Sequence, residues 1–308
     1  MNMKDHVVIV TGAGGGIGRA TALLLGKLGA RVVVNDYGGD TAGQPGDIGR
    51  AQAVADEIRA AGGEATANAE PVGAVRAAEN IRDAALAAYG RIDALINNAG
   101  IMAIGDVDEI SDALLDRVIE TNFLGAFRLL RAVWPGMRAR GYGRIVNVSS
   151  SSLLGFGDRA PYCAAKAALI GLTADAAVSG KPHGILVNSL LPAAFTRLTN
   201  GQAGGADAVD PAMWEMLREN FAPDFVASTA AFLVSPELSI TGEHFVSGAN
   251  RAARLAHFET AGWRAPGLTM ADIAANIAAI RDTSRGAFVA SGQEELAQFM
   301  PALEAMVR

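Results

Sequence analysis

The chain has 308 residues, of which 50% are apolar and 19% are charged, and its net charge is −6. This composition suits a large folded core, and the dispersed charge argues against nucleic acid as a partner. One cysteine and four histidines are too few for a structural zinc site, so no metal is expected. We find no uncharged apolar run of ~20 residues and no signal-peptide pattern, which predicts a cytoplasmic protein without a membrane span.

Apolar, β-branched segments recur between longer segments that have helical spacing. The clearest segments are residues 6–12, 31–36, 93–100, 143–150, 184–192 and 243–249, and residues 64–69 form a weaker one. Strands that alternate with helices indicate right-handed βαβ units, and continuous apolar strands suit a sheet covered on both faces. The sequence therefore predicts an α/β fold with a doubly wound parallel sheet of about seven strands and helices on both faces.

Two segments interrupt this alternation. Residues 37–47 are rich in Gly and Pro and are typical of a long loop. Residues 251–308 follow the last predicted strand, and Thr269 and Asp272 there are spaced as in a helix capping box. We therefore expect a domain over residues 1–250 and a helical C-terminal extension over residues 251–308, packed on the same domain.

A glycine-rich turn, TGAGGGIGRA at residues 11–20, follows the first strand and begins a helix. Gly12 permits the tight turn, Gly16 lets the backbone approach a pyrophosphate, and Gly18 lets the helix pack close to the sheet. The helix N-terminus offers N–H groups and a positive dipole end to phosphate. A flexible turn in a glycine-rich chain is the simpler alternative, but the strand before and the helix after favour dinucleotide binding.

Asp36 ends the second strand, 18 residues beyond Gly18. A carboxylate at this place accepts hydrogen bonds from ribose hydroxyls and repels a 2′-phosphate. Since no Lys or Arg immediately follows, NAD is favoured over NADP as the cofactor. A solvated Asp side chain is the alternative.

Tyr162 precedes Lys166 by four residues, downstream of a run of serines at residues 149–152. Residues four apart on a helix share one face, and Pro161 suits a first helical position. An ammonium group nearby would lower the pKa of the phenol, so that Tyr162 exchanges a proton with an alcohol while a serine hydroxyl holds the substrate oxygen. The pair alone is weak evidence, but its place after a strand and a dinucleotide turn strengthens it.

In their order and spacing, these motifs resemble those of the short-chain dehydrogenase/reductase family. The resemblance covers residues 6–250 and includes TGAGGGIG, Asp36, NNAG at 97–100, TNFLG, NVSS at 147–150, and Tyr162 with Lys166. It implies that Tyr162 is the general acid/base and that a serine positions the substrate oxygen. It also implies that Lys166 binds the nicotinamide ribose and tunes Tyr162, and that Asn122 of TNFLG anchors a water of a proton relay.

The same resemblance implies a set of cofactor-binding residues. They are Gly12, Gly16, Ile17, Gly18, Asp36, Glu70, Asn98, Gly100, Tyr162, Lys166, Pro192 and Thr196. Within this set, Asn98 is expected against the adenosine ribose, Glu70 near the adenine and Thr196 at the nicotinamide amide.

The sequence departs from the family pattern at three places. The usual spacing of thirteen residues before Tyr162 selects Ser149, whereas alignment on the end of the strand selects Ser150. We favour Ser150 because the strand fixes the direction of the side chain. Pro192-Ala193 replaces the family's Pro-Gly, and Glu70 replaces its Asp.

Residues 32–40, 191–199, 222–233 and 243–255 more closely resemble the (3R)-hydroxyacyl-CoA dehydrogenase modules of multifunctional β-oxidation enzymes. This implies NAD-dependent interconversion of a secondary alcohol and a ketone on a small molecule that is CoA-linked or steroid-like. A ketoreductase or hydroxysteroid dehydrogenase without CoA recognition stays open, as does, more remotely, a non-catalytic NAD-binding sensor.

Two further expectations concern the substrate and the assembly. Specificity should lie in residues 193–222, where Arg197 either meets an anionic substrate group or is solvated. The resemblance implies a homodimer or homotetramer through the helices that follow the fourth and fifth strands.

Overall fold

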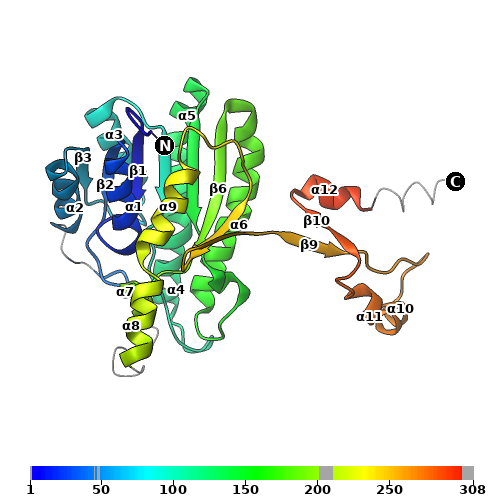
Figure 1. Cartoon of the computed structure of the whole chain (residues 1–308). Helices are drawn as coiled ribbons and strands as arrows, with labels where there is room; N and C mark the ends of the chain where they lie inside the picture. Colours follow the sequence, from blue (N-terminus) through cyan, green and yellow to red (C-terminus); the bar gives the residue numbers. More distant parts are fainter. Residues whose placement is uncertain (1, 45, 47–48, 201–210, 300–308) are drawn as a thin grey trace. The chain divides into compact units, whose positions relative to one another are not determined.

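The structure is a computed structural model, and it describes residues 2–44, 46, 49–200 and 211–299 (Figure 1). The internal contacts divide the chain into two compact units, Met1–Arg254 and Leu255–Arg308. This boundary lies close to the predicted one at residue 250, but the tail is a unit of its own by its internal contacts. Each unit is described by itself.

The first unit is built on a mostly parallel eight-stranded sheet with the order β3-β2-β1-β4-β5-β6-β7-β8. β1 pairs in parallel with both β2 and β4, so the strand order reverses at β1, the place where sheets of this kind bind ligands. The predicted α/β fold is thus confirmed, including the weaker third strand. The strands are β1 Val7–Thr11, β2 Arg31–Asn35, β3 Glu64–Asn68, β4 Ala94–Asn97, β5 Gly143–Val148, β6 Ile185–Pro192, β7 His244–Gly248 and β8 Arg251–Leu255.

Helices cover both faces of this sheet (Figure 1). Val8 and Val10 of β1 lie in a core layer with α1, α2 and α9, whereas Ile9 lies in a second layer with α3, α5 and α6. Alternation of side chains along a strand buries both faces, which explains the continuous apolar strands. The helices are α1 Gly16–Lys27, α2 Gly49–Ala60, α3 Ala77–Tyr89, α4 Asp112–Ile119, η1 Glu120–Leu124, α5 Gly125–Arg140, η2 Ser151–Leu154, α6 Ala160–Gly180, η3 Lys181–His183, α7 Arg197–Asn200, α8 Pro211–Asn220 and α9 Pro223–Leu233.

The eighth strand, β8, is absent from the prediction of about seven strands. Ala249 and Asn250, which lie between β7 and β8, have φ values of 46° and 58°. Positive φ at both residues of a two-residue loop is the geometry that reverses a chain into a hairpin. Asn tolerates this conformation, but Ala gives no sequence signal for it, so the turn was missed.

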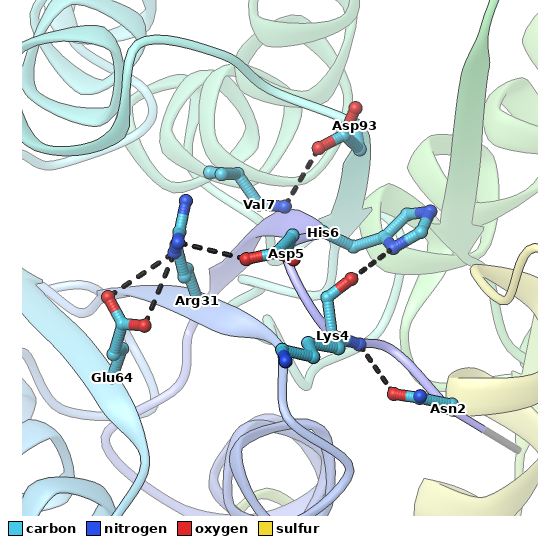
Figure 2. Close-up of polar contacts among 8 residues, drawn as sticks. All are labelled: Asn2, Lys4, Asp5, His6, Val7, Arg31, Glu64 and Asp93. Carbon is cyan, nitrogen blue, oxygen red and sulfur yellow. Dashed lines mark hydrogen bonds and ion pairs between the residues drawn. The ribbon is translucent and has the colours of Figure 1, made fainter.

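Charged side chains link the starts of the strands at the amino edge of the sheet (Figure 2). Arg31 contacts Asp5 at 2.9 Å and Glu64 at 3.3 Å. The buried Asp93 carboxylate accepts a hydrogen bond of 2.9 Å from the backbone N–H of Val7. These contacts connect β1, β2, β3 and the start of β4. None of them involves a residue of the predicted active site.

α6 continues through η3, and together they form a helical segment of 24 residues, Ala160–His183, that is rich in apolar side chains. By length and composition alone this segment suits a membrane span, the one such helix among the described residues. Helices of protein cores share that composition, and here Ala165 and Ala177 pack in two core clusters of the first unit. Packing therefore accounts for part of the apolar side chains of α6, whereas Val178 stays exposed.

The second unit contains strands as well as helices. β9 His257–Thr260 pairs antiparallel with β10 Gly286–Val289, and the Phe258 and Phe288 rings meet edge to face at 5.3 Å. Over its described residues, the predicted helical extension thus contains three helices, and it also contains two strands that were not predicted, because the alternation in a strand of four residues is too short to recognise. Its helices are α10 Met270–Ala275, α11 Ile277–Ile280 and α12 Gly292–Ala297, and the capping box of Thr269 and Asp272 is confirmed.

Candidate active site

A cavity of about 390 Å³ lies at the carboxyl ends of β1, β2 and β4, where the strand order reverses. Its wall includes eight predicted cofactor residues: Gly12, Gly16, Ile17, Asp36, Glu70, Asn98, Gly100 and Thr196. Four others, Gly18, Tyr162, Lys166 and Pro192, are not part of this wall. The sequence therefore brings most of the predicted binding set together, with the Tyr/Lys pair outside the main cavity.

The glycine-rich turn has close neighbours that leave no room for side chains. Gly12 has a φ of +64°, and a Cβ there would lie 2.8 Å from the Cα of Ala99. A Cβ on Gly18 would lie 2.3 Å from the carbonyl oxygen of Gly12. Both glycines are thus required by the approach of the turn to β4 and to the start of α1, as their places in the motif predict.

Asp36 joins the turn to the loop after β2. Its Oδ2 accepts a hydrogen bond of 2.8 Å from the Gly14 N–H, and its Oδ1 accepts one of 2.7 Å from the Gly38 N–H. A carboxylate has about four acceptor positions, so two hydrogen bonds leave capacity for ribose hydroxyls. Its negative charge remains in the cavity wall.

Asn98 mainly positions the turn. Its side-chain amide nitrogen donates to the carbonyl oxygens of Thr11 at 2.8 Å and Gly12 at 3.2 Å. The Thr11 hydroxyl oxygen in turn accepts from the backbone N–H groups of Asn98 and Ala99, each at 3.0 Å. Any contact between Asn98 and a ribose would therefore use Oδ1. From the sequence we assigned no role to Thr11, although it is the first residue of the glycine-rich motif.

The loop after β2 forms another side of the cavity. Tyr37, Asp40 and Thr41 line it, and the Thr41 carbonyl oxygen accepts a hydrogen bond of 2.9 Å from the Met102 N–H. A Cβ on Gly43 would lie 3.0 Å from the Ile101 side chain. This loop thus reaches the segment after β4, a contact that the sequence indicated only as a long loop.

Tyr162 and Lys166 lie on one face of α6, as their spacing predicts. Lys166 Nζ lies 5.6 Å from the centre of the Tyr162 ring and donates a hydrogen bond of 2.7 Å to the Val148 carbonyl oxygen. Burial lowers the pKa of Lys166 to about 8. Burial also raises the pKa of Tyr162, whereas a hydrogen bond with Ser150 and the charge of Arg159 act in the lowering direction.

The net direction for Tyr162 differs from the sequence prediction. We expected the ammonium of Lys166 to lower the pKa of the phenol, but the largest influence is loss of water around the hydroxyl, which disfavours the phenolate. Burial of a residue is not visible in a Y-x-x-x-K spacing, so the spacing predicts Lys166 as the neighbour of Tyr162 but not the loss of water around the phenol.

The two candidate serines face different groups. Ser149 is 1% exposed, and its hydroxyl donates a hydrogen bond of 2.7 Å to the Lys166 carbonyl oxygen. The Ser150 hydroxyl accepts a bond of 3.1 Å from the Ser152 N–H, and it lies near enough to the Tyr162 hydroxyl to act on the pKa of the phenol in the lowering direction. The structure thus brings Ser150, and not Ser149, to the Tyr162 hydroxyl, since neighbouring residues in extended backbone point to opposite sides.

Asn122 lies in η1, a π-helical turn between α4 and α5. Its Oδ1 accepts a bond of 2.8 Å from the Ile101 N–H, and its Nδ2 donates one of 2.8 Å to the Ile101 carbonyl oxygen. A Cβ on Gly100 would lie 3.3 Å from Asn122 Oδ1 and 3.4 Å from Lys166 Nζ. Gly100, Asn122 and Lys166 therefore meet, and single π-helical turns often occur at functional sites.

The remaining predicted residues lie at the cavity rim or beyond it. The Glu70 backbone is held by hydrogen bonds with the side chains of Asn68 and Asn35, and Glu70 lines the cavity. Thr196 packs against the turn, because a Cβ on Gly16 would lie 3.2 Å from its Cγ2. Of the predicted specificity segment 193–222, residues 201–210 lie outside the described residues.

The amino-acid sequence of the chain is similar to those of known oxidoreductases. A sequence model described as short chain dehydrogenase matches residues 6–204. The chain is 36% identical over 304 residues to peroxisomal multifunctional enzyme A of Dictyostelium discoideum, covering 98% of this chain and 66% of that protein. It is 38% identical over 285 residues to a putative short-chain type dehydrogenase/reductase of Mycobacterium tuberculosis, covering 92% of this chain and 96% of that protein.

Two solved structures resemble the chain over nearly its whole length. Full-length peroxisomal multifunctional enzyme type 2 from Drosophila melanogaster matches with a TM-score of 0.81 and 26% identity, over 99% of this chain and 51% of that one. A short chain dehydrogenase from Mycobacterium avium matches with a TM-score of 0.78 and 33% identity, over 95% of this chain and 100% of that one. The chain thus spans about half to two thirds of these two multifunctional enzymes and almost all of the two mycobacterial proteins.

Proposed function

Since the chain belongs to the short-chain dehydrogenase/reductase family of oxidoreductases that act on CH–OH groups, we propose that it interconverts a secondary alcohol and a ketone with NAD(H). The observation that carries the proposal is the meeting of Ser150, Tyr162 and Lys166 beside the glycine-lined cavity. The Ser149 hydroxyl donates a hydrogen bond to the Lys166 carbonyl oxygen, which connects the end of β5 to α6.

The residues of the cavity fit an adenine dinucleotide. Gly12 and Gly16 have positive φ and leave a cradle that a Cβ would fill, and the N-terminus of α1 lies at its floor. Asp36 adds a carboxylate that suits ribose hydroxyls and disfavours a 2′-phosphate, which supports NAD over NADP. NAD, when bound, would supply the hydride acceptor and a positively charged ring.

In the oxidation direction, Tyr162 accepts the proton of the substrate hydroxyl while Ser150 holds the same oxygen. Because burial raises the pKa of Tyr162, the phenolate requires positive charge close by. Lys166 lies on the same helical face, and Arg159 acts on the phenol as well. Since the pKa of Lys166 is lowered to about 8, its ammonium can lose and regain a proton near neutral pH. Asn122 fixes the backbone of Ile101 next to this group, where a proton relay would begin.

For the substrate we propose a 3-hydroxyacyl-CoA-like thioester. The support is the similarity of the chain to proteins named peroxisomal multifunctional enzyme and peroxisomal hydratase-dehydrogenase-epimerase. A ketoreductase or hydroxysteroid dehydrogenase without CoA recognition is the second candidate, since Ser150, Tyr162 and Lys166 would act on the carbinol of such a substrate in the same way. A non-catalytic NAD-binding sensor would need a broken Ser/Tyr/Lys/Asn set, and the set here is intact.

The test of the substrate class follows NADH absorbance with NAD and a panel of (3R)- and (3S)-hydroxyacyl-CoA, a hydroxysteroid and simple secondary alcohols. We expect selective turnover of one hydroxyacyl-CoA enantiomer, the (3R) form, with inhibition by CoA alone. Turnover of free alcohols or steroids only, without inhibition by CoA, would exclude the thioester and leave the second candidate.

We further propose that the protein is a homodimer or homotetramer. The support is apolar surface on helices around the fourth and fifth strands, where Phe127 of α5 and Val178 of α6 are 40% and 56% exposed. Light scattering of the purified protein at several concentrations tests this, and a mass of a single chain throughout would contradict it.

A further inference from the structure

Arg197, the first residue of α7, lies over the glycine-rich turn. A Cβ on Gly15 would lie 3.5 Å from the Arg197 Nη2 and 3.9 Å from its Nε, so the edge of the guanidinium faces Gly15 directly. Thr196 approaches the next residue of the turn, Gly16, in the same way. Two consecutive residues after β6 thus cover two consecutive glycines at the start of α1.

The surroundings of this guanidinium are positive. Gly15 is the N-cap of α1, and it provides no side chain to cap the helix; the first turn also lacks an acidic residue. A helix N-terminus carries about half a positive charge, and a guanidinium is always protonated in proteins. The carboxylate of Asp36, the acid of the turn, accepts hydrogen bonds from Gly14 and Gly38 instead. Two positive groups therefore face each other across Gly15.

Arg197 is one of several arginines without an ion-pair partner among the described residues, and Arg117 of the same cavity wall is another. The ion pairs that join described residues involve Arg19, Arg31, Arg59, Arg82, Arg91, Arg159, Arg218 and Arg254. Arg197 has no such partner among the described residues and stays exposed at the cavity wall. An anion placed between the helix end and the guanidinium would satisfy both.

We propose that Arg197 binds the diphosphate of the dinucleotide from the side opposite the N-terminus of α1. Its planar fork of N–H groups matches phosphate oxygens in a bidentate geometry, whereas the helix supplies backbone N–H groups from below. The proposal rests on the proposed function, which assigns the glycine-lined cavity to the cofactor.

The geometry favours the cofactor over an anionic substrate group. Gly15, Asp36 and Arg197 share one cavity wall, but Ser150 and Tyr162 are not part of it. A substrate whose oxygen lies between Ser150 and Tyr162 is therefore held elsewhere, and the phosphates are the anions of the ligand that this wall receives. Arg197 also lies within residues 193–222, the segment predicted to set substrate specificity, and it begins α7, so its contact would couple cofactor binding to the placement of α7.

The test measures the affinity of the protein for ADP-ribose, which carries the diphosphate but neither nicotinamide nor a 2′-phosphate. Isothermal calorimetry compares wild type, Arg197→Gln, Arg197→Lys and the control Arg218→Gln. Arg218 is exposed in α8, pairs with Glu215 at 2.8 Å and is not part of the cavity wall. Loss of a charge-assisted hydrogen bond predicts a Kd about tenfold higher or more for Arg197→Gln and a smaller increase for Arg197→Lys.

Three outcomes decide the proposal. An increase of about tenfold in Arg197→Gln, with Arg218→Gln within about twofold of wild type and unchanged melting temperatures, supports the diphosphate contact. Unchanged ADP-ribose affinity with an increase only in the KM of the alcohol would assign Arg197 to the substrate and overturn the proposal. Failure of wild type itself to bind ADP-ribose would instead refute the proposed cofactor, and the site with it.

Discussion

Asp93 and Lys166 are both buried charged residues, but they lie at opposite edges of the central sheet and have different partners. Asp93, at the amino edge, contacts Arg91 at 2.6 Å and accepts the Val7 N–H. Lys166, at the carboxyl edge, donates to the carbonyl oxygen of Val148, and none of the ion pairs among the described residues includes it.

The difference shows that the two edges of the sheet have different roles. Contacts at the amino edge stabilise the fold, whereas side chains at the carboxyl edge form the candidate active site. At the amino edge, charges meet opposite charges and the backbone, as Figure 2 shows for Arg31 with Asp5 and Glu64. At the carboxyl edge, polar side chains are held by the backbone, as Asn122 is by Ile101. A side chain fixed by the backbone keeps its position whether or not a ligand is present. Its remaining charge or lone pairs then face the ligand, which is what a preorganised site requires.

The largest expected effect is that of Tyr162→Phe. We predict a loss of about 10²-fold or more in kcat, the scale of general acid–base catalysis, with NADH affinity preserved. The matched control is Tyr142→Phe, because Tyr142 lies at the amino edge, where its ring meets His6 and Arg144. Steady-state rates and NADH fluorescence titrations of both variants check this, and similar rates in the two variants would contradict the difference between the edges.

Replacement of Lys166 should change the pH dependence of stability. The pKa of Lys166 is about 8 when folded against 10.5 for the free side chain, so the unfolded chain binds more protons between these values. Stability of the wild type should therefore rise as pH increases from about 8 to 10.5, by roughly 3 kcal/mol at most. In Lys166→Met this rise should be absent, although activity is lost.

Urea unfolding at several pH values measures this difference. Below pH 8, wild type should have a lower unfolding free energy than Lys166→Met. This difference should become smaller as the pH rises. Parallel curves for the two proteins across this range would show that the buried amine has no depressed pKa.

Substitution of the two serines should affect different properties: Ser150→Ala the reaction rate, and Ser149→Ala mainly the stability. We predict that Ser150→Ala lowers kcat/KM by about tenfold or more, because its hydroxyl contacts Tyr162. Ser149→Ala should act mainly on stability, by about 1 kcal/mol, because it loses the hydrogen bond to the Lys166 carbonyl oxygen. Rates and unfolding curves of both variants are the measurement, and a larger rate loss in Ser149→Ala would reverse the assignment.

The smallest effect is expected for Arg31→Met at the amino edge. Its ion pairs with Asp5 and Glu64 are largely exposed, so they contribute about 0–1 kcal/mol in total. We expect the unfolding free energy of Arg31→Met to fall by an amount within that range, and its turnover to be unchanged. A rate loss comparable with that of Ser150→Ala would show that the two edges are coupled.

Much of this molecule could be predicted from its sequence because the relevant signals are local. The βαβ alternation predicted the strands, and the turn at residues 11–18 predicted the glycines whose missing side chains the packing requires. The preference for Ser150 over Ser149 rests on local direction as well, because the strand end sets which hydroxyl faces Tyr162, but which serine acts in catalysis stays a prediction.

The features that sequence reasoning missed depend on contacts between distant segments. Thr11 is important because Asn98 and Ala99, from another strand, use its hydroxyl. The raised pKa of Tyr162 depends on burial by the surrounding segments, which no spacing reveals. β8 required positive φ at Ala249, a residue type that rarely adopts it.

The central claim is hydride transfer at Tyr162, and its most direct test uses substrates that carry deuterium on the carbinol carbon. Wild type and Tyr162→Phe would be incubated with NAD and the deuterated hydroxyacyl-CoA and hydroxysteroid, and the reduced cofactor analysed by mass spectrometry. We predict that each NADH formed carries one deuterium, and that Tyr162→Phe forms labelled NADH about 10²-fold more slowly than wild type does. NADH without deuterium would contradict hydride transfer from the carbinol carbon, and equal rates of labelled NADH formation by the two proteins would contradict the role of Tyr162.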